Sequence, residues 1–187
     1  MAIEIFLVIP SVDPEYGDEV AGDEYFTPAT FHNAAIIQID DYDFGTENNV
    51  SIGSQSTGAG AGKTQFNPLV IHKRVSKASF YLFAASTAGH PLDAIKLYIR
   101  RDRALSAHGN PDTGPFLSFE FHTVFVTKVE WSGSSAADDA SETVTFAYGA
   151  VATHYQAPAT ASGNQPPVVQ GGWNQVANNS AVPATLP

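Results

Sequence analysis

The sequence predicts a mostly β domain with a single α-helix, on three observations. Six segments have the apolar or alternating pattern of β-strands, and only one segment has helical spacing. Turns rich in glycine and proline separate these segments. The chain of 187 residues is long enough for one domain with a buried core, and 12 Phe and 7 Tyr supply core material. The predicted strands are residues 3–9, 34–44, 66–75, 92–101, 116–131 and 142–155.

Two long connections join the first three predicted strands. Residues 3–9 are an apolar run that ends before Pro10, and residues 10–32 are acidic and rich in turn residues. The strand at 34–44 is apolar at first and then alternates. Residues 45–65 are polar and rich in glycine, so we expect a loop between this strand and the next one.

The predicted helix spans residues 76–88. Ser76 or Ser79 can cap its N-terminus, and Gly89 lies where a left-handed glycine commonly ends a helix. Apolar residues at helical spacing predict a stripe that packs against a sheet. The residues of this predicted stripe are Phe80, Phe83, Ala84 and Ala88.

The second half of the chain contains the longer predicted strands. Residues 116–131 are apolar in both phases, which predicts one face in the core and partial cover over the other. We expect the last strand to bend at Gly149. The strand at 92–101 alternates between an apolar and a polar set. The apolar set is Ile95, Leu97 and Ile99, and the opposite set is Lys96, Tyr98 and Arg100.

The chain changes character after residue 155. Residues 156–187 carry no charge and five Pro, a composition typical of a disordered tail. Trp173 is an exception, because an exposed Trp is uncommon without a surface on which to dock. We therefore expect Trp173 to anchor the tail. This change of composition divides the chain into a domain at 1–155 and a C-terminal extension at 156–187.

The net charge of −10 is distributed unevenly. Residues 1–62 hold 11 acidic and no basic residues, residues 63–128 hold 9 basic and 4 acidic, and residues 129–187 hold 4 acidic and no basic. Such an acidic chain is a poor nucleic-acid binder, because Lys and Arg supply most of the non-specific affinity for phosphate. The segregation admits two explanations: solubility, or contact between an acidic face of one copy and a basic face of another.

The usual patterns of catalytic and metal-binding residues are missing. The chain has no Cys, which excludes disulfides, thiol catalysis and cysteine metal sites. None of the six His has a convincing metal-ligand spacing, and residues 40–47 do not fit the EF-hand pattern. We therefore expect no catalytic residue, no metal and no cofactor. The chain has no apolar run of membrane-spanning length and no basic n-region, so we expect synthesis in the cytoplasm without a signal peptide.

The segment GAGAGKT at residues 58–64 is similar to the end of a nucleotide-binding P-loop. The P-loop pattern places its first glycine at position 57, where this chain has Thr57. Pro68 and a β-favouring run follow the segment, although a P-loop needs a helix there. The sequence therefore predicts a glycine-rich loop between two strands instead of a phosphate site.

Three stretches together resemble the Hcp family (haemolysin-coregulated protein), the tube proteins of type VI secretion systems. GSQSTGAGAGKTQFNPLVIHKRVSKAS, residues 53–79, resembles the family's glycine/serine loop, the next strand and the start of the helix. LFAASTAGH, residues 82–90, resembles the end of that helix, and SETVTFAYGAVATHY, residues 141–155, resembles the closing strand. The resemblance covers residues 34–155. The stretch at 10–32 is longer and more acidic than the family usually has, and residues 156–187 extend past its usual end.

The resemblance implies a two-sheet β-barrel-like domain with one α-helix, related to phage tail tube proteins. It implies a structural subunit that forms homohexameric rings, which stack into a tube and are exported, with effectors carried or chaperoned in the lumen. The expected partners are the chain itself and spike, sheath and effector proteins, without nucleic acid or membrane insertion. The protein would assemble in the cytoplasm and then be secreted. The residues expected at contacts between subunits or stacked rings are Gly53, Gly58, Gly60, Gly62, Lys63 and Thr64.

Other functions stay open from the sequence. A phage tail or another contractile injection machine has tube proteins of the same architecture, and neighbouring sheath and baseplate genes would distinguish these systems. A monomeric β-sandwich that binds carbohydrate would need an exposed aromatic platform. An enzyme would need nucleotide at residues 58–64, and the strand predicted after them argues against it.

Overall fold

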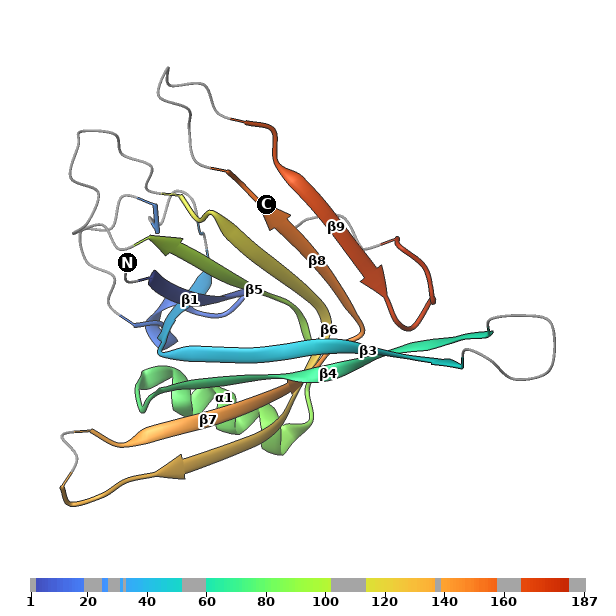
Figure 1. The fold of residues 1–187 in the computed structure, drawn as a ribbon. Coiled ribbons are helices and arrows are strands. Elements are labelled where there is room, and N and C mark those ends of the chain that lie inside the picture. Colours follow the sequence, from blue (N-terminus) through green and yellow to red (C-terminus); the bar gives the residue numbers. More distant parts are fainter. Residues whose placement is uncertain are drawn as a thin grey trace.

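The computed structural model describes residues 3–18, 25–26, 31, 33–51, 60–101, 114–136, 139–157 and 166–181. Within them, two antiparallel sheets share one long strand, and an α-helix packs beside them (Figure 1). The predicted class, a mostly β, two-sheet, barrel-like domain with one α-helix, is confirmed. The elements are β1 (Ile3–Pro10), η1 (Pro14–Tyr16), β2 (Ala34–Ile39), β3 (Asp41–Ser51), β4 (Gly60–Arg74), α1 (Lys77–Ala88), β5 (Leu92–Arg101), β6 (Leu117–Ser132), β7 (Ser141–Ala147), β8 (Ala150–Tyr155) and β9 (Val169–Asn174).

The two sheets are joined at both sides. The first sheet has the order β2-β1-β5-β6-β8-β9, and the second has the order β3-β4-β7-β6. Asp40 lies between β2 and β3, and its N–H donates to the carbonyl of His72 in β4 at 2.8 Å. The sequence predicted one strand over residues 34–44, which is wrong because the chain passes from the first sheet to the second at Asp40.

β6 is the strand that both sheets share. Its first half pairs with β5 and β8, and its second half pairs with β7. The strand bends between these halves at Thr123, which has a φ of 55°. The N–H of Gly149 donates to the carbonyl of His122 at 2.9 Å. A Cβ at Gly149 would lie 3.3 Å from the Cβ of Thr123, so the close approach favours glycine. The predicted bend at Gly149 is confirmed, but the single strand predicted over residues 142–155 is wrong, because the bend divides it into β7 and β8.

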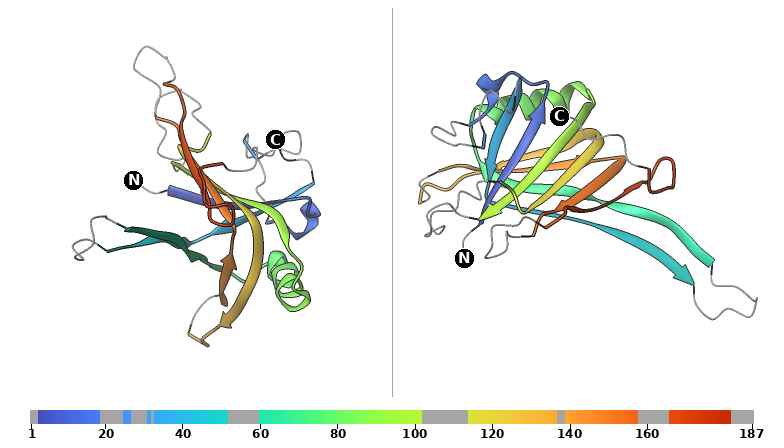
Figure 2. Two further views of the ribbon diagram at one scale, coloured as in Figure 1. Left: turned by 90° about the vertical axis from the view of Figure 1, so that its right-hand side faces the viewer. Right: turned by 90° about the horizontal axis from the view of Figure 1, so that it is seen from above.

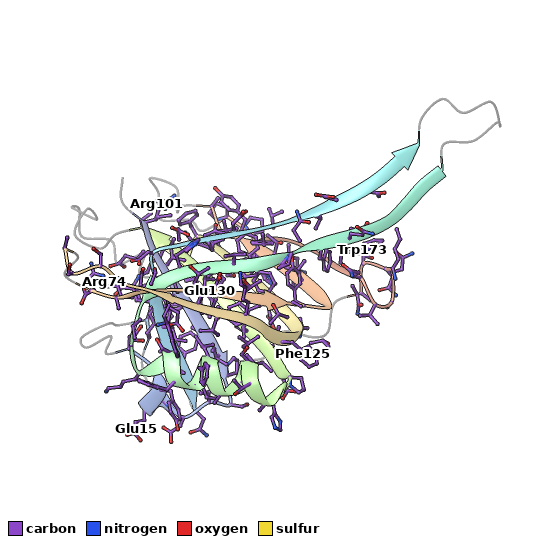
Figure 3. All side chains as sticks on the ribbon, turned by 90° about the horizontal axis from the view of Figure 1, so that it is seen from below. Glu15, Arg74, Arg101, Phe125, Glu130 and Trp173 are labelled. Carbon is purple, nitrogen blue, oxygen red and sulfur yellow. The ribbon has the colours of Figure 1, made fainter. Side chains whose placement is uncertain are left out.

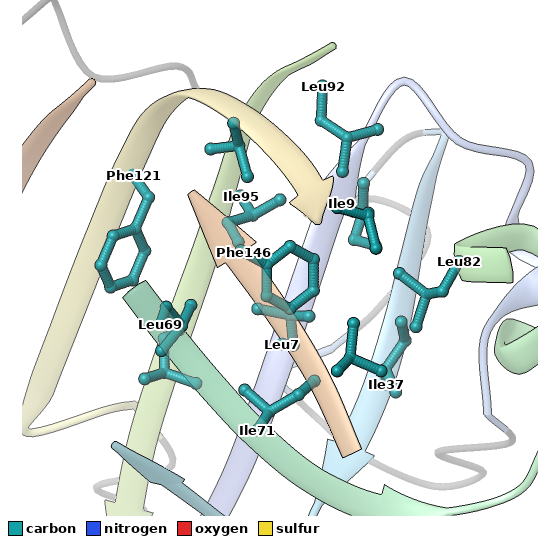
Figure 4. Close-up of a cluster of buried hydrophobic side chains, with 14 of the residues drawn as sticks. Leu7, Ile9, Ile37, Leu69, Ile71, Leu82, Leu92, Ile95, Phe121 and Phe146 are labelled. Atoms are coloured by element: carbon teal, nitrogen blue, oxygen red, sulfur yellow. The ribbon is translucent and has the colours of Figure 1, made fainter. Parts of the chain in front are cut away.

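The core lies between the sheets and is closed on one side by α1 (Figure 4). Leu7, Ile37, Leu69 and Phe121 are fully buried in it, together with Leu82 from the helix. Each of these positions falls on the inward phase of its strand or on the buried face of the helix. Apolar side chains from both sheets and from the helix therefore fill the space between the sheets.

The outer face of the first sheet carries a smaller apolar cluster. Phe6, Val8 and Tyr98 lie there, and Phe26 covers them. The guanidinium of Arg100 lies 4.8 Å from the ring centroid of Phe6, and its Nε is 2.6 Å from a carboxylate oxygen of Glu4. The polar face predicted for β5 is therefore buried as well as the apolar face, because residues from the 10–32 connection cover it.

The helix ends as predicted but buries a different face. Ser76 is the N-cap, and Gly89 ends the helix in the left-handed region with a φ of 65°. The predicted stripe is wrong: the side chains of Phe80 and Phe83 are 69% and 45% exposed. The buried residues are instead Ala78, Ser79, Leu82 and Ala85. These side chains are mostly small, so the helix lies close to the sheet, while Phe80 and Phe83 lie outside its buried face.

Candidate assembly surface

A two-stranded hairpin extends from the body of the domain. β4 pairs with β7 only over Leu69–Arg74, whereas β3 and β4 remain paired as far as Ser51 and Gly60. Residues 45–51 and 60–68 therefore form a projecting hairpin, which Figures 1 and 2 show leaving the body. The prediction of a loop over 45–65 is wrong for residues 45–51 and 60–65, which belong to β3 and β4. Antiparallel pairing satisfies the backbone groups that face each other in the hairpin, although most of its side chains are polar or glycine.

Four of the six residues predicted to make subunit contacts lie on the projecting hairpin. Gly60 and Gly62 lie in β4 near its far end. Lys63 is exposed, and Thr64 is half-buried opposite Asn48. Gly53 and Gly58 lie outside the described residues.

The free edge of β3 is acidic, both in the body and along the projecting hairpin. β3 pairs with β4 on one side and ends the strand order on the other. Asp41, Asp43 and Glu47 are exposed along it. The register with β4 is interrupted between Asp43 and Gly45 and again between Asn48 and Val50. Carboxylates and bulges both oppose edge-to-edge pairing of identical strands.

The C-terminal segment is docked on the body through β9. All six residues of β9 pair in register with β8, from Ala150 opposite Asn174 to Tyr155 opposite Val169. Trp173 lies opposite Val151 and is half-buried. Figure 3 shows Trp173 at the end of the body from which the projecting hairpin leaves. Sequence reasoning identified this residue but not the strand that contains it.

Two hydrogen bonds hold the turn after β9. The side chain of Gln175 accepts the N–H of Phe66 in β4 at 2.8 Å. The backbone N–H of Gln175 donates to the carbonyl of Gly149 at 2.9 Å. Gln175 thus connects the C-terminal segment to the base of the projecting hairpin. No sequence motif indicated this contact, because the two residues are 109 positions apart.

A buried ion pair fixes α1 to the second sheet. Nζ of Lys73 lies 3.0 Å from a carboxylate oxygen of Glu142, and both side chains are 0% exposed. Ser79 of the helix donates to Glu142 at 2.6 Å and accepts from Lys73 at 3.1 Å. The indole N–H of Trp131 donates to the other oxygen of Glu142 at 3.0 Å. Sequence reasoning missed this network, although three of its members lie in stretches that resemble the Hcp family.

This network also orients an exposed aromatic pair. Trp131 is 51% exposed, and its ring lies 5.3 Å from that of Phe83 between centroids. Phe80 is exposed on the same helix. The indole is held by a buried carboxylate while much of its ring faces solvent. Such a fixed, exposed aromatic residue is suited to contact a partner.

A second buried polar cluster lies on the outer face of the first sheet. Nε2 of His122 lies 3.3 Å from Glu120, whose other carboxylate oxygen is 3.9 Å from Nζ of Lys96. All three residues are buried. Burial lowers the pKa of His122; the negative charge of Glu120 opposes this shift, and the positive charge of Lys96 adds to it. His122 is therefore held neutral at neutral pH.

The described residues contain no recognisable centre for metal chemistry. No three His, Asp or Glu side chains in that part of the chain are grouped to hold a metal ion. A cavity of about 360 Å³ is lined by polar side chains and by charged side chains of both signs. Its lining residues are Asp18, Gln38, Asp40, Arg74 and Ser76. None of the described helices is long and apolar enough to cross a membrane.

Comparison with solved structures finds the same fold in secretion proteins. A structure described as a type six secretion system protein superposes with a TM-score of 0.77 at 22% identity, covering 96% of this chain and 100% of that chain. Hcp1 from Salmonella typhimurium gives a TM-score of 0.67 at 20% identity, covering 97% and 100%. A type VI secretion system effector from Yersinia pestis gives 0.58 at 15% identity, covering 91% and 98%. A comparison with curated proteins finds no match.

A family model provides the assignment that structures at this identity do not. The model described as type VI secretion system effector, Hcp, matches residues 29–155, which is more than half of the chain. The match contains most of the barrel, the projecting hairpin, the helix and the buried ion pair. It ends before β9. The chain therefore belongs to the Hcp family of type VI secretion tube proteins.

Proposed function

We propose that this chain is a tube subunit that forms homohexameric rings, which stack and are exported with effectors in the lumen. The observation that carries the proposal is the projecting hairpin on an Hcp fold. A paired element that leaves the body exposes surface on all sides and reaches beyond its own domain. Contact with a second subunit or ring would bury that surface.

The predicted contact residues have the chemistry that such a contact needs. Glycine at 60 and 62 permits close approach of another backbone. The ammonium group of Lys63 is exposed and suits an acidic surface, such as β3 of a neighbouring copy. We propose that Gly53, Gly58 and Thr64 also lie at contacts between subunits or stacked rings. The domain at 1–155 forms the ring, and the extension at 156–187 docks through Trp173.

We also propose that the chain acts as a structural subunit and catalyses no reaction. Assembly would be driven by burial of interface area, and expulsion would be driven by the rest of the secretion machine. Spike and sheath proteins are the other proposed partners. Export takes place after assembly in the cytoplasm.

The test is the native mass, followed by negative-stain imaging. We expect a species near six times the chain mass of 19.9 kDa, with ring-shaped particles. A monomer at high concentration, also in the presence of baseplate components, would contradict the proposal. That result would favour the monomeric carbohydrate-binding alternative, because the Phe83–Trp131 pair supplies an exposed aromatic surface.

A further inference from the structure

The three free sheet edges in the described structure differ in how they are protected. β2, β3 and β9 each pair with one neighbour and end a sheet. An exposed edge offers unpaired N–H and carbonyl groups to another strand, so proteins commonly protect it. The described residues protect two of these edges and leave the third open.

The edge of β2 is occupied by Asp18. The backbone N–H of Asp18 donates to the carbonyl of Ile36 at 2.7 Å. Its carboxylate accepts the N–H of Gln38 at 2.9 Å. One residue thus satisfies two outward backbone groups of β2, and another strand cannot pair there without displacing it. The edge of β3 is protected against a second β3 edge by the exposed carboxylates of Asp41, Asp43 and Glu47.

The edge of β9 has none of these protections. Residues 156–187 carry no charge, and β9 contains no proline. Its register with β8 is continuous. Among the described residues, only Asn179 pairs with its outer side, at Asn174. Val169 is 66% exposed at the other end, and Val168 before it is 50% exposed.

The open edge is also attached firmly to the body. Trp173 is half-buried behind it, and Gln175 ties the following turn to β4 and Gly149. β9 is the outermost strand of the first sheet (Figure 1). An uncharged strand of continuous register with unpaired outer backbone groups is a template for strand addition. We propose that β9 of one subunit pairs with the β3 edge of a second copy of this chain.

The choice of β3 follows from the edges that a second copy offers. Pairing of β9 with β9 is self-complementary, so it would close a dimer. The β2 edge is occupied by Asp18. Two β3 edges repel each other through Asp41, Asp43 and Glu47, but the uncharged β9 does not repel them. A β9–β3 contact joins two different surfaces, so it can continue from subunit to subunit, and it closes a ring where the rotation between neighbours returns to the first subunit.

This inference rests on the proposed ring. It is tested by introducing a charged side chain at Val169. Beside the acidic β3 edge, Val169→Glu should raise the concentration needed for half-assembly about tenfold or more. Val169→Lys should assemble within about threefold of the wild type, because its charge is complementary. Val176 lies in the turn after β9 and is 75% exposed, so Val176→Glu and Val176→Lys are matched controls that should leave assembly unchanged. Asp43→Lys should restore assembly of Val169→Glu.

Disulfide trapping tests the same contact directly. The chain has no Cys, so each disulfide reports an introduced pair. Gln170→Cys combined in one chain with Cys at Asp41, Asp43 or Glu47 should give, for at least one combination, a cross-linked ladder up to the hexamer. Gln170→Cys alone should give no ladder.

The outcomes separate this inference from the proposed function. If both Val169 variants form rings at the wild-type concentration and no β9–β3 disulfide forms, the inference is wrong, but the proposed function as a tube subunit is unaffected. Equal loss with Glu and Lys, or cross-linked dimers from Gln170→Cys alone, would indicate β9–β9 or purely apolar contact and also overturn it. A wild-type chain that never assembles would overturn both.

Discussion

Removal of the carboxylate of Glu142 should strongly destabilise the domain. The substitution Glu142→Ala leaves the buried ammonium of Lys73 without its counter-ion, and Ser79 and Trp131 lose their acceptor. Breaking a buried ion pair by removing one partner costs about 3–5 kcal/mol. For a chain of this length, that loss lowers the melting temperature by roughly 6–20 °C. The loss is large because the side chain of Lys73 is 0% exposed, so solvent does not replace the lost carboxylate.

Two further variants show whether burial is the cause. Lys73→Met with Glu142→Leu removes both charges and should recover more than half of the loss, because apolar replacement of a buried pair is often nearly neutral. Glu130→Ala breaks the exposed Lys128–Glu130 pair, whose atoms are 2.8 Å apart, and should cost at most about 1 kcal/mol. The Lys128–Glu130 pair has the same two residue types as the Lys73–Glu142 pair, but it is exposed to solvent.

The measurement is urea unfolding followed by tryptophan fluorescence. The protein concentration must keep the native mass constant, because assembly adds stability by mass action. Trp131 reports directly on the network, since its indole donates to Glu142. A Glu142→Ala variant that loses no more free energy of unfolding than Glu130→Ala would refute the reasoning.

Three further predictions concern acid, the glycine loop and salt. The lowered pKa of His122 means that, below about pH 6.5, this group binds protons more readily in the unfolded chain than in the folded one, so the free energy of unfolding should fall as the pH drops through that value. Thermal melts of the wild type and of His122→Gln between pH 7.5 and 5.5 check this, and equal slopes would contradict it. Bulky replacements at residues 58–62 should weaken ring stacking without lowering the melting temperature of the monomer, as sedimentation and thermal melts would measure; joint loss of stacking and stability counts against this role. High salt should weaken association between rings if opposite charges meet there, and light scattering that is unchanged from low to high salt would remove that explanation.

Local backbone chemistry was predictable from the sequence. Ser76 and Gly89 set the ends of the helix, because capping and the left-handed conformation depend on a few neighbouring residues. Gly149 marked the bend between β7 and β8, since the chain approaches Thr123 too closely for a side chain. β5 was predicted with its observed bounds, because its alternation is regular.

The buried face of the helix was not predictable in the same way. Hydrophobicity favoured Phe80 and Phe83 as the packed residues, but the small residues around Leu82 lie against the sheet. That choice depends on the distance between helix and sheet and on the hydrogen bonds of Ser79 to Lys73 and Glu142. Neither is visible until distant segments meet.

The candidate assembly surface was also only partly predictable from the sequence. The sequence singled out the glycine loop and Trp173, since unusual composition and a lone aromatic residue are visible without a partner. It did not show that residues 45–51 and 60–68 pair as a projecting hairpin, or that Trp173 lies in a strand. Backbone pairing needs a partner strand, and polar or glycine-rich side chains give little sign of one.

The sequence by itself determined the class of the fold, its single α-helix with both ends, the bend at Gly149 and the resemblance to the Hcp family. These features follow from periodicity, local conformational preference and motifs. The tertiary structure decided which face of the helix is buried, which charges lose contact with water and which sheet edges stay open. Each of these depends on the packing of segments far apart in the chain, as the contact of Gln175 with Phe66 shows.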